Sequence, residues 1–242
     1  MKPPSLMGRP TNRPPGLDPY QLIFDDIETF SIDSDTEEWQ KIEKYFDQTQ
    51  GEKPLPVQLV DIIEIKKPNE PAFEFPGEKT LLWHGTTKSN LPLIINDGLM
   101  INPHAAVFRA GGILGKGVYF SDSFAKSASY SVRTNRGAEN YILLCEVFLG
   151  KTFSSTNFFD LKNKEKILGH DSIKAIGKIT SLASDNDDLN GVQVPSMLQQ
   201  RESSTENSRL HYQLEFNEYV VFDEKRIKPK YLVRFLNTNM SS

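Results

Sequence analysis

The sequence predicts a mainly β fold of the α+β class, and three observations support this prediction. Short apolar runs of strand-like composition recur along most of the chain. Helical periodicity is confined to a few short segments, and the chain contains no internal repeat. A length of 242 residues with 38% apolar residues suits one large domain, or one domain with a small appendage, and fills a substantial core.

The N-terminal part of the chain is expected to lie outside the main domain. Residues 1–34 are rich in proline and then acidic, which is typical of a flexible arm with a solvated acidic face. Residues 35–54 are expected to hold an amphipathic helix over 36–48 and a linker. Asp35 is the expected N-cap of this helix, and Glu38 completes a capping box. The apolar residues at helical spacing are Trp39, Ile42, Tyr45 and Phe46.

The main domain is predicted over residues 55–242. Its strands are expected at residues 57–66, 80–84, 141–149, 173–178, 217–223 and 229–236. Its helices are expected at residues 91–97, 123–131 and near 160–167. Asn90 is the expected cap of the first helix and Gly98 its end, and Asp122 or Ser123 caps the second. Residues 102–116 and 181–213 are predicted to be loops, and the second is long enough to be functional or disordered.

Charge and cysteine content narrow the class of protein. The net charge of −4 implies no broad basic surface, which weighs against nucleic acid as the main partner. The single cysteine, Cys145, excludes an intrachain disulfide, favours a reducing compartment and is expected to be a buried structural residue. Neither a signal peptide nor a membrane-spanning stretch is evident, so we expect a soluble intracellular protein, nuclear or cytoplasmic, with no membrane partner.

Three motifs carry residues suited to chemistry. They are Leu-Leu-Trp-His-Gly-Thr (81–86), Gly-Lys-Gly-Val-Tyr-Phe-Ser-Asp (115–122) and Phe-Asn-Glu-Tyr-Val-Val (216–221). They present His84, Tyr119 and Glu218 at the edges of predicted strands, with no metal-ligand cluster beside them. A histidine or tyrosine in such a position, taken alone, is more often structural. A carboxylate within a strand costs free energy unless it is paired or solvated, so Glu218 invites a functional interpretation.

A helix face and a glycine add to this set. Lys126 and Tyr130 are four residues apart and share one face of a predicted helix, and Ser127 lies beside that face. Gly85 permits a close backbone approach, so its N–H and C=O groups can pair with a planar amide.

In combination, these motifs resemble the catalytic domain of the poly(ADP-ribose) polymerases, the diphtheria-toxin-like ADP-ribosyltransferases. The resemblance runs from about Val57 to Phe235, and it implies a mainly antiparallel two-sheet ADP-ribosyltransferase fold with short peripheral helices. His84, Tyr119 and Glu218 match the His-Tyr-Glu triad of that family.

The resemblance also implies the substrate and the roles of the site residues. The substrate is NAD, and no metal is needed. The implied catalytic residues are Glu218, His84, Tyr119 and Lys126. The implied NAD-binding residues are His84, Gly85, Thr86, Asn90, Gly117, Tyr119, Ser127 and Tyr130. Among them, Gly85 and Ser127 would grip the carboxamide, and Tyr119 and Tyr130 would sandwich the nicotinamide ring. Residues 102–116 would cover the donor, and residues 181–213 would border the acceptor.

The expected function is that of an NAD-dependent protein ADP-ribosyltransferase, which releases nicotinamide and modifies proteins, itself included. In the family, a glutamate at position 218 is compatible with poly(ADP-ribose) formation. DNA-dependent members carry a helical subdomain before the catalytic fold, whereas at most one helix corresponds to it here, so we expect activity without DNA. The alternatives are single transfer, NAD hydrolysis, a silent NAD- or ADP-ribose-binding module, and modification of nucleic-acid ends.

Overall fold

The computed structural model describes residues 27–51, 53–68, 70–101, 112, 114–131, 137–200 and 214–238, with the backbone alone at 182–185 and 196–200. Residues 1–26, most of the expected loop at 102–116 and the end of the expected loop at 181–213 lie outside the described residues. The expectations for the proline-rich arm, for residues 102–116 as a cover of the donor and for residues 181–213 as a border of the acceptor therefore stay predictions.

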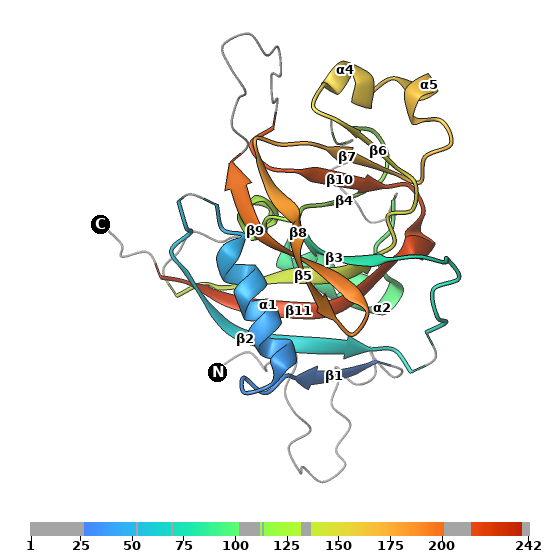
Figure 1. Ribbon diagram of the computed structural model, residues 1–242. Coiled ribbons are helices and arrows are strands. Elements are labelled where there is room, and N and C mark those ends of the chain that lie inside the picture. Colours follow the sequence, from blue (N-terminus) through green and yellow to red (C-terminus); the bar gives the residue numbers. More distant parts are fainter. Residues whose placement is uncertain are drawn as a thin grey trace.

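The described chain forms two sheets, which lie one above the other in Figure 1. In spatial order, the larger sheet contains β1 (Glu28–Ser31), β2 (Val57–Lys66), β11 (Ile227–Asn237), β5 (Glu139–Val147), β3 (Lys79–His84), β9 (Val192–Gln200) and β8 (Ile179–Leu189). The smaller sheet contains β4 (Val118–Phe120), β10 (Glu218–Val221), β7 (Ser172–Ala175) and β6 (Thr152–Ser155). The pairs β3·β9 and β6·β7 are parallel and the other pairs are antiparallel. The expected α+β class with two mainly antiparallel sheets is confirmed.

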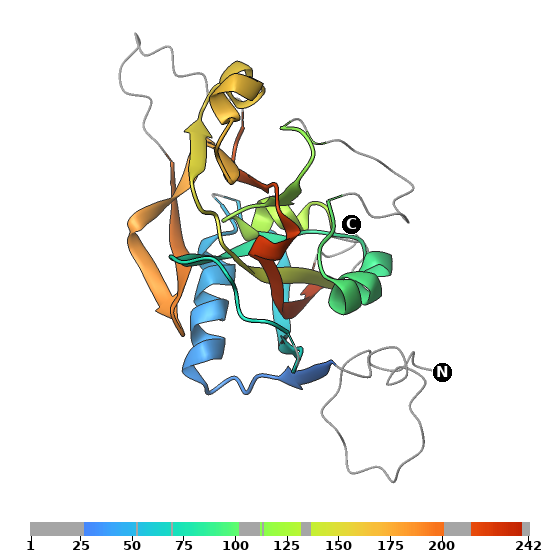
Figure 2. The same cartoon turned by 90° about the vertical axis from the view of Figure 1, so that its right-hand side faces the viewer.

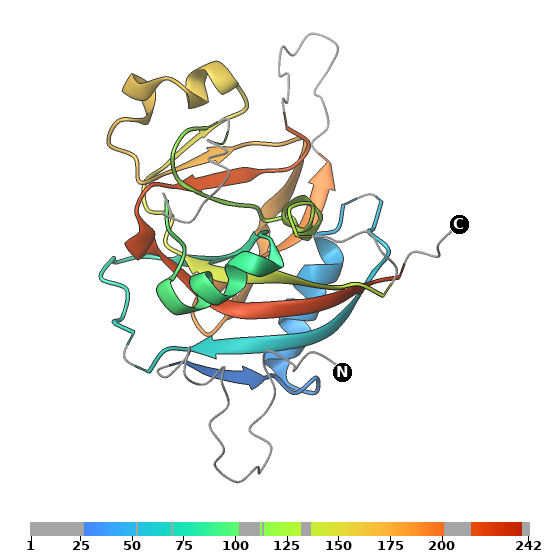
Figure 3. The same ribbon diagram turned by 180° about the vertical axis from the view of Figure 1, so that it is seen from behind.

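The helices are short and peripheral, as expected. They are α1 (Glu37–Gln48), α2 (Leu91–Asp97), α3 (Phe124–Ala128), α4 (Phe158–Leu161) and α5 (Lys164–Ile167), with the 3₁₀ turns η1 (Lys88–Asn90) and η2 (Glu224–Arg226). Helix α1 covers one face of the larger sheet, which is seen in Figure 1, and α2 covers the opposite face, which is seen in Figure 3. Figure 2 shows the sheet edge-on, between the two helices.

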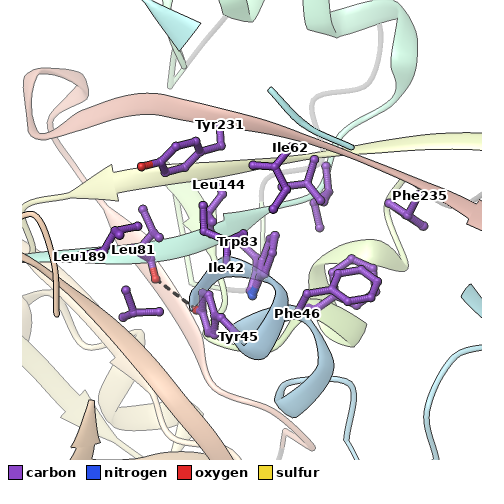
Figure 4. Close-up of a cluster of buried hydrophobic side chains, with 14 of the residues drawn as sticks. Ile42, Tyr45, Phe46, Ile62, Leu81, Trp83, Leu144, Leu189, Tyr231 and Phe235 are labelled. Atoms are coloured by element: carbon purple, nitrogen blue, oxygen red, sulfur yellow. Dashed lines mark hydrogen bonds between the residues drawn. The ribbon is translucent and has the colours of Figure 1, made fainter. Parts of the chain in front are cut away.

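Alternating residues of the central strands feed two cores. On the α1 side, Leu81 and Trp83 of β3 pack with Ile42, Tyr45 and Phe46 of α1 (Figure 4). On the α2 side, Leu82 of β3 packs with residues of α2 and β5, including the fully buried Cys145, which confirms the expected structural cysteine. Burial contributes roughly 1.5–3 kcal/mol for each large apolar side chain, so both helices are held by the sheet rather than by their own propensity.

The capping expectations were partly wrong. Thr36, and not Asp35, caps α1, because its side chain accepts a hydrogen bond from the Trp39 N–H. Asn90 precedes α2 but its side chain makes no capping bond, since its backbone is already helical in η1. Of the two candidates for α3, Ser123 is the cap.

The prediction of a loop over 181–213 was wrong for its first part. Strands β8 and β9 form a hairpin that turns at Asn190 and Gly191, both in the left-handed region (φ 55° and 79°). The segment is polar in composition because the hairpin lies at the edge of the sheet. Its residues in the core include Leu189, Val192 and Val194. Strands β1, β4 and β6, of four residues or fewer, were also not predicted.

Two further findings concern exclusions. In the described ranges, no helix is both long and apolar enough to cross a membrane. Across the same described residues, no cluster of three or more His, Cys, Asp or Glu side chains could bind a metal ion.

Candidate active site

The three motif residues meet where the two sheets touch. A β-bridge joins Trp83 of β3 to Ser121, just after β4, through backbone hydrogen bonds of 2.9 and 3.0 Å. Strand β4 in turn pairs with β10, so that Tyr119 lies opposite Val220. His84 at the end of β3, Tyr119 in β4 and Glu218 at the start of β10 are thereby brought to one region.

His84 is fixed by the strand that carries Tyr119. Its Nδ1 lies 2.8 Å from the backbone oxygen of Tyr119. A carbonyl oxygen only accepts hydrogen bonds, so Nδ1 carries the proton and, in the neutral ring, Nε2 is an acceptor. Burial lowers the pKa of His84, and the hydrogen bond to Tyr119 offsets part of this effect. The ring is therefore a neutral acceptor near pH 7.

Tyr119 is anchored at its hydroxyl as well as at its backbone. The hydroxyl donates to the Gly115 oxygen (2.8 Å) and accepts from the Leu114 N–H (3.1 Å). Burial raises its pKa to about 12, with the nearby Glu218 contributing. A Cβ on Gly112 would lie 2.0 Å from the ring, so the turn before β4 wraps tightly around this side chain. The phenol stays protonated and its ring has a fixed orientation.

Glu218 forms an ion pair with a lysine from α3. Lys126 Nζ lies 2.6 Å from Glu218 Oε1, and it also donates to the Tyr130 hydroxyl at 3.2 Å. Burial lowers the pKa of Lys126, but the hydrogen bond and the charge of Glu218 outweigh it, so the pKa is raised overall. The Glu218 side chain is only 12% exposed. Within the described residues, its Oε2 has no hydrogen-bond partner, which leaves one carboxylate oxygen available for a ligand.

Helix α3 is pressed against the end of β3. A Cβ on Gly85 would lie 1.8 Å from the Ser127 backbone oxygen, so only glycine permits this approach. The Ser127 hydroxyl is buried and donates to the Trp83 oxygen at 3.0 Å. Gly85, Ser127 and Tyr130 are thus neighbours, although α3 ends at Ala128 and Tyr130 follows it in a turn.

The two expected stacking residues differ in environment. Tyr119 is half-buried, whereas Tyr130 is 60% exposed. Among the described aromatic pairs, the rings of Tyr119 and Tyr130 are not in contact with each other. The two rings therefore do not close the space between them by packing together.

The remaining predicted NAD-binding residues lie at the edge of this region or pack against the strands that form it. Asn90 Nδ2 donates to Thr86 Oγ1 at 3.1 Å, and Asn90 is exposed. Gly117 packs on β10, where a Cβ would lie 2.4 Å from Val220 Cγ1. A depression of about 640 Å³ lies elsewhere, beside Thr80 and Arg226, and includes none of these residues.

A buried polar cluster under Glu218 was missed from the sequence. Asp122 and Asn217 are fully buried and hydrogen-bonded to each other, at 2.6 Å, and to Thr180 and Ser181 of β8. The sequence indicates only a possible capping role for Asp122, and Ser123 fills that role. A signal existed, because both polar residues stand in apolar motifs next to Tyr119 or Glu218, but their contact depends on the unpredicted β8.

Sequence comparison relates this chain to known proteins. A sequence profile described as "Poly(ADP-ribose) polymerase catalytic domain" matches residues 36–237. The chain is 32% identical to Poly [ADP-ribose] polymerase 1 of Caenorhabditis elegans over 90% of its length and 24% of that protein. It is also 32% identical to Poly [ADP-ribose] polymerase 1 of Gallus gallus, over 89% of this chain and 21% of the relative. For Poly [ADP-ribose] polymerase 2-A of Oryza sativa subsp. japonica, the identity is again 32%, over 88% of this chain and 32% of the relative.

Two conclusions follow from these matches. The chain has the fold of an ADP-ribosyltransferase, and it belongs to the poly(ADP-ribose) polymerase catalytic-domain family, which confirms the resemblance inferred from its motifs. It spans between about a fifth and a third of the length of these three relatives.

Proposed function

We propose that this protein is an NAD-dependent ADP-ribosyltransferase that modifies proteins, itself included, and releases nicotinamide. The single observation that carries the proposal is the ion pair between Glu218 and Lys126 (2.6 Å), beside an anchored Tyr119 and a neutral His84. A largely buried carboxylate, whose Oε2 has no hydrogen-bond partner among the described residues, suits the stabilisation of a cationic sugar. Family membership supports NAD as the donor, and no metal is required.

The donor is held by groups of both sheets. The N–H and C=O groups of Gly85 pair with the carboxamide, and Ser127 adds its hydroxyl. The rings of Tyr119 and Tyr130 enclose the nicotinamide, which favours offset stacking. His84 Nε2 accepts a hydrogen bond from a hydroxyl of the adenosine ribose.

Three predicted residues complete the proposed binding site. Thr86 and Asn90 lie at its rim, and Gly117 shapes the strand that carries Tyr119.

The chemistry is a glycosyl transfer. The bond between ribose C1′ and the nicotinamide nitrogen breaks, and its electron pair neutralises the pyridinium ring, so no strong general acid is needed. The sugar becomes oxocarbenium-like, and Glu218 stabilises it through the 2′-hydroxyl. The acceptor then forms its bond to C1′ and gives its proton to Glu218 or to solvent. Lys126 orients Glu218 for both tasks.

The product is proposed to be a polymer, because a glutamate stands at position 218. Activity is proposed not to need DNA, and nucleic acid is not proposed as a strong partner, because the net charge is −4. Single transfer, NAD hydrolysis and silent binding are the competing outcomes of the test below.

The test is incubation of the purified chain with labelled NAD, with and without nicked DNA, and separation of the products by size. Glu218→Gln is expected to lower nicotinamide release by about 100-fold or more, because a carboxylate that stabilises the transition state is lost. Glu215→Gln is the matched control, since Glu215 is an exposed carboxylate three residues away, and it is expected to keep the wild-type rate.

The outcomes separate the candidates. Label that spreads upward from the protein band indicates a polymerase, and a discrete band indicates single transfer. Nicotinamide release without protein label indicates a hydrolase. The proposal is contradicted if neither nicotinamide release nor protein label is seen, or if Glu218→Gln keeps the wild-type rate. A large rise in turnover with nicked DNA contradicts DNA independence.

A further inference from the structure

We propose that Asp122 is a positioning residue for the reaction: a buried carboxylate that fixes the strand carrying Glu218 from the face opposite Lys126. The inference rests on the proposed function, in which Glu218 is the catalytic carboxylate. Asp122 itself is fully buried and does not take part in binding NAD in the proposed arrangement.

Asp122 grips both neighbours of Glu218. Its Oδ2 accepts from Asn217 Nδ2 at 2.6 Å and from the Tyr219 hydroxyl at 3.1 Å. Successive side chains of a strand point to opposite faces, so residues 217 and 219 share the face away from Glu218. Lys126 holds the carboxylate of Glu218 itself, at 2.6 Å. The strand is therefore clamped from both faces at this residue.

Asn217 links Asp122 to the backbone that leads into Glu218. Its second amide proton goes to Thr180 Oγ1 (2.6 Å), and its Oδ1 accepts from the Gly177 N–H (2.9 Å). Its backbone oxygen, in the peptide bond that leads into Glu218, accepts from the Ser121 hydroxyl at 2.7 Å. With its side chain and carbonyl all engaged, Asn217 has little freedom to rotate, and the start of β10 is fixed with it.

A carboxylate is a costly choice for a purely structural anchor. A buried charge costs free energy unless several donors satisfy it, and here three donors converge on one oxygen, with Ser181 Oγ at 2.7 Å as the third. Across the described residues, Asp122 Oδ1 has no hydrogen-bond partner. What the charge provides is stronger and more directional hydrogen bonds to the residues around Glu218, which suits the positioning of a reacting group.

The test is a double-mutant comparison of single-turnover nicotinamide release, with enzyme in excess so that slow variants are measured. Asp122→Ala is expected to lower the rate about 10- to 100-fold, as a misplacement of about 1 Å does. The KM for NAD, measured separately at steady state, is expected to change less than about threefold. In a Glu218→Gln background, the same substitution is expected to change the rate less than about threefold, because the group it positions is already gone.

Thr180→Val is the milder second variant, and it carries the test if Asp122→Ala does not fold. It removes one of the two acceptors of Asn217 Nδ2 and keeps the side-chain shape. It is expected to lower the wild-type rate about threefold to tenfold, again only when Glu218 is present. Ser172→Ala is the matched control, because Ser172 is a buried hydroxyl opposite Val221, at the other end of β10. It is expected to lower the melting temperature without this dependence on Glu218.

The outcomes distinguish the inference from the function beneath it. Equal fold-losses in the wild-type and Glu218→Gln backgrounds, for Asp122→Ala or for Thr180→Val if the former does not fold, would overturn the positioning role and leave the function intact. A wild-type rate in Glu218→Gln alone would remove the proposed function and the inference with it. Losses confined to the background that keeps Glu218 would support both.

Discussion

At the scale of single residues, the site depends on which protons its side chains keep. His84 must be neutral if Nε2 is to accept a hydrogen bond from the donor, and its Nδ1 proton is held by the Tyr119 carbonyl. Burial lowers the pKa of His84 below the ordinary value of 6.5. The lowered value extends the neutral form, and with it the proposed contact to NAD, to more acidic solutions.

We therefore expect a one-sided pH effect on the KM for NAD. The KM is expected to be constant from pH 8 to 6.5 and to rise at lower pH, where protonation converts Nε2 into a donor. The folded protein resists this protonation, so stability is also expected to fall as pH decreases below 6.5 towards the lowered pKa of His84. KM against pH in wild type and in His84→Gln measures the effect. A rise in KM that begins above pH 7 would contradict the lowered pKa.

Lys126 gives the opposite pH dependence. Its pKa is raised despite burial, because Glu218 accepts its hydrogen bond at 2.6 Å. A raised folded pKa means that the ion pair stabilises the fold fully below 10.5 and that this contribution is lost as pH rises through the raised pKa. Lys126→Met is expected to lower the melting temperature at pH 7 to 9, with the difference from wild type shrinking above pH 10.5.

Catalysis provides a second measurement on Lys126. Lys126→Met is expected to lower kcat about 10-fold. Lys126→Arg is expected to stay closer to the wild-type kcat, because the arginine restores a charge-assisted hydrogen bond to Glu218. If both variants kept the wild-type rate while the melting temperature fell, Lys126 would be a structural partner only.

At the scale of elements, the join between β3 and α3 sets the geometry of the proposed carboxamide site. Gly85→Ala introduces a Cβ 1.8 Å from the Ser127 oxygen, and this contact is to backbone, so α3 must move. Overpacking of this kind costs about 1–3 kcal/mol of unfolding free energy. Because α3 carries Ser127 and Lys126, the activity is expected to fall by more than this loss of stability alone would cause.

The measurements are denaturant unfolding and the KM for NAD. Gly169→Ala is the control with the opposite defect: its Cβ meets no atom within 4 Å, but its φ of 76° is strained for alanine. The control is expected to lose about 1 kcal/mol of stability and to keep its KM. An unchanged KM in Gly85→Ala would show that the contact does not control the donor site.

The elements also show why some of the fold was readable from the sequence and some was not. Helix α1 and the apolar strands β2, β3, β5, β10 and β11 were found, because their periodicity or composition reports burial directly. The β8–β9 hairpin was missed although Asn190-Gly191 is a strong turn signal, since its polar strands lie at the edge of the sheet. The hairpin joins the sheet through the pairing of β9 with β3, and that pairing is not local in sequence.

The same limit applies to the site. Gly85, Ser127 and Tyr130 were assigned to one site by the family resemblance, and the helix predicted over 123–131 placed Ser127 close to Tyr130. The Asp122–Asn217 contact spans 95 positions in the sequence and depends on β8, so no local pattern announces it.

At the scale of the whole molecule, the junction of two sheets is what makes a site from distant segments. The larger sheet supplies His84, the smaller sheet supplies Tyr119 and Glu218, and α3 spans the junction. The start of α3 is held in turn by α1, because the Thr49 oxygen accepts from the Ser123 hydroxyl at 2.9 Å. The segment that contains α1, which was expected to be an appendage, therefore helps to position α3 and the candidate site.

The domain boundary expected at residue 55 stays a prediction, and the contacts of α1 argue for an earlier one. Ile42, Tyr45 and Phe46 are at most 1% exposed and belong to one core with Trp83 of β3. Removal of residues 1–54 would expose the sheet beneath them, at a cost of about 5–9 kcal/mol for three large apolar side chains, which approaches the whole stability of a typical domain. We expect this truncated chain not to unfold cooperatively and to lack activity.

Removal of residues 1–34 is the matched control. It deletes β1, a four-residue strand that pairs with β2 at the edge of the described sheet, and keeps the Thr36 cap with all of α1. This variant is expected to fold, with a lower melting temperature, and to keep nicotinamide release close to wild type. Thermal unfolding and nicotinamide release of both truncations measure the difference. A cooperative transition and activity in the chain that starts at residue 55 would place the boundary there and would mean that β3 and α3 hold their geometry without α1.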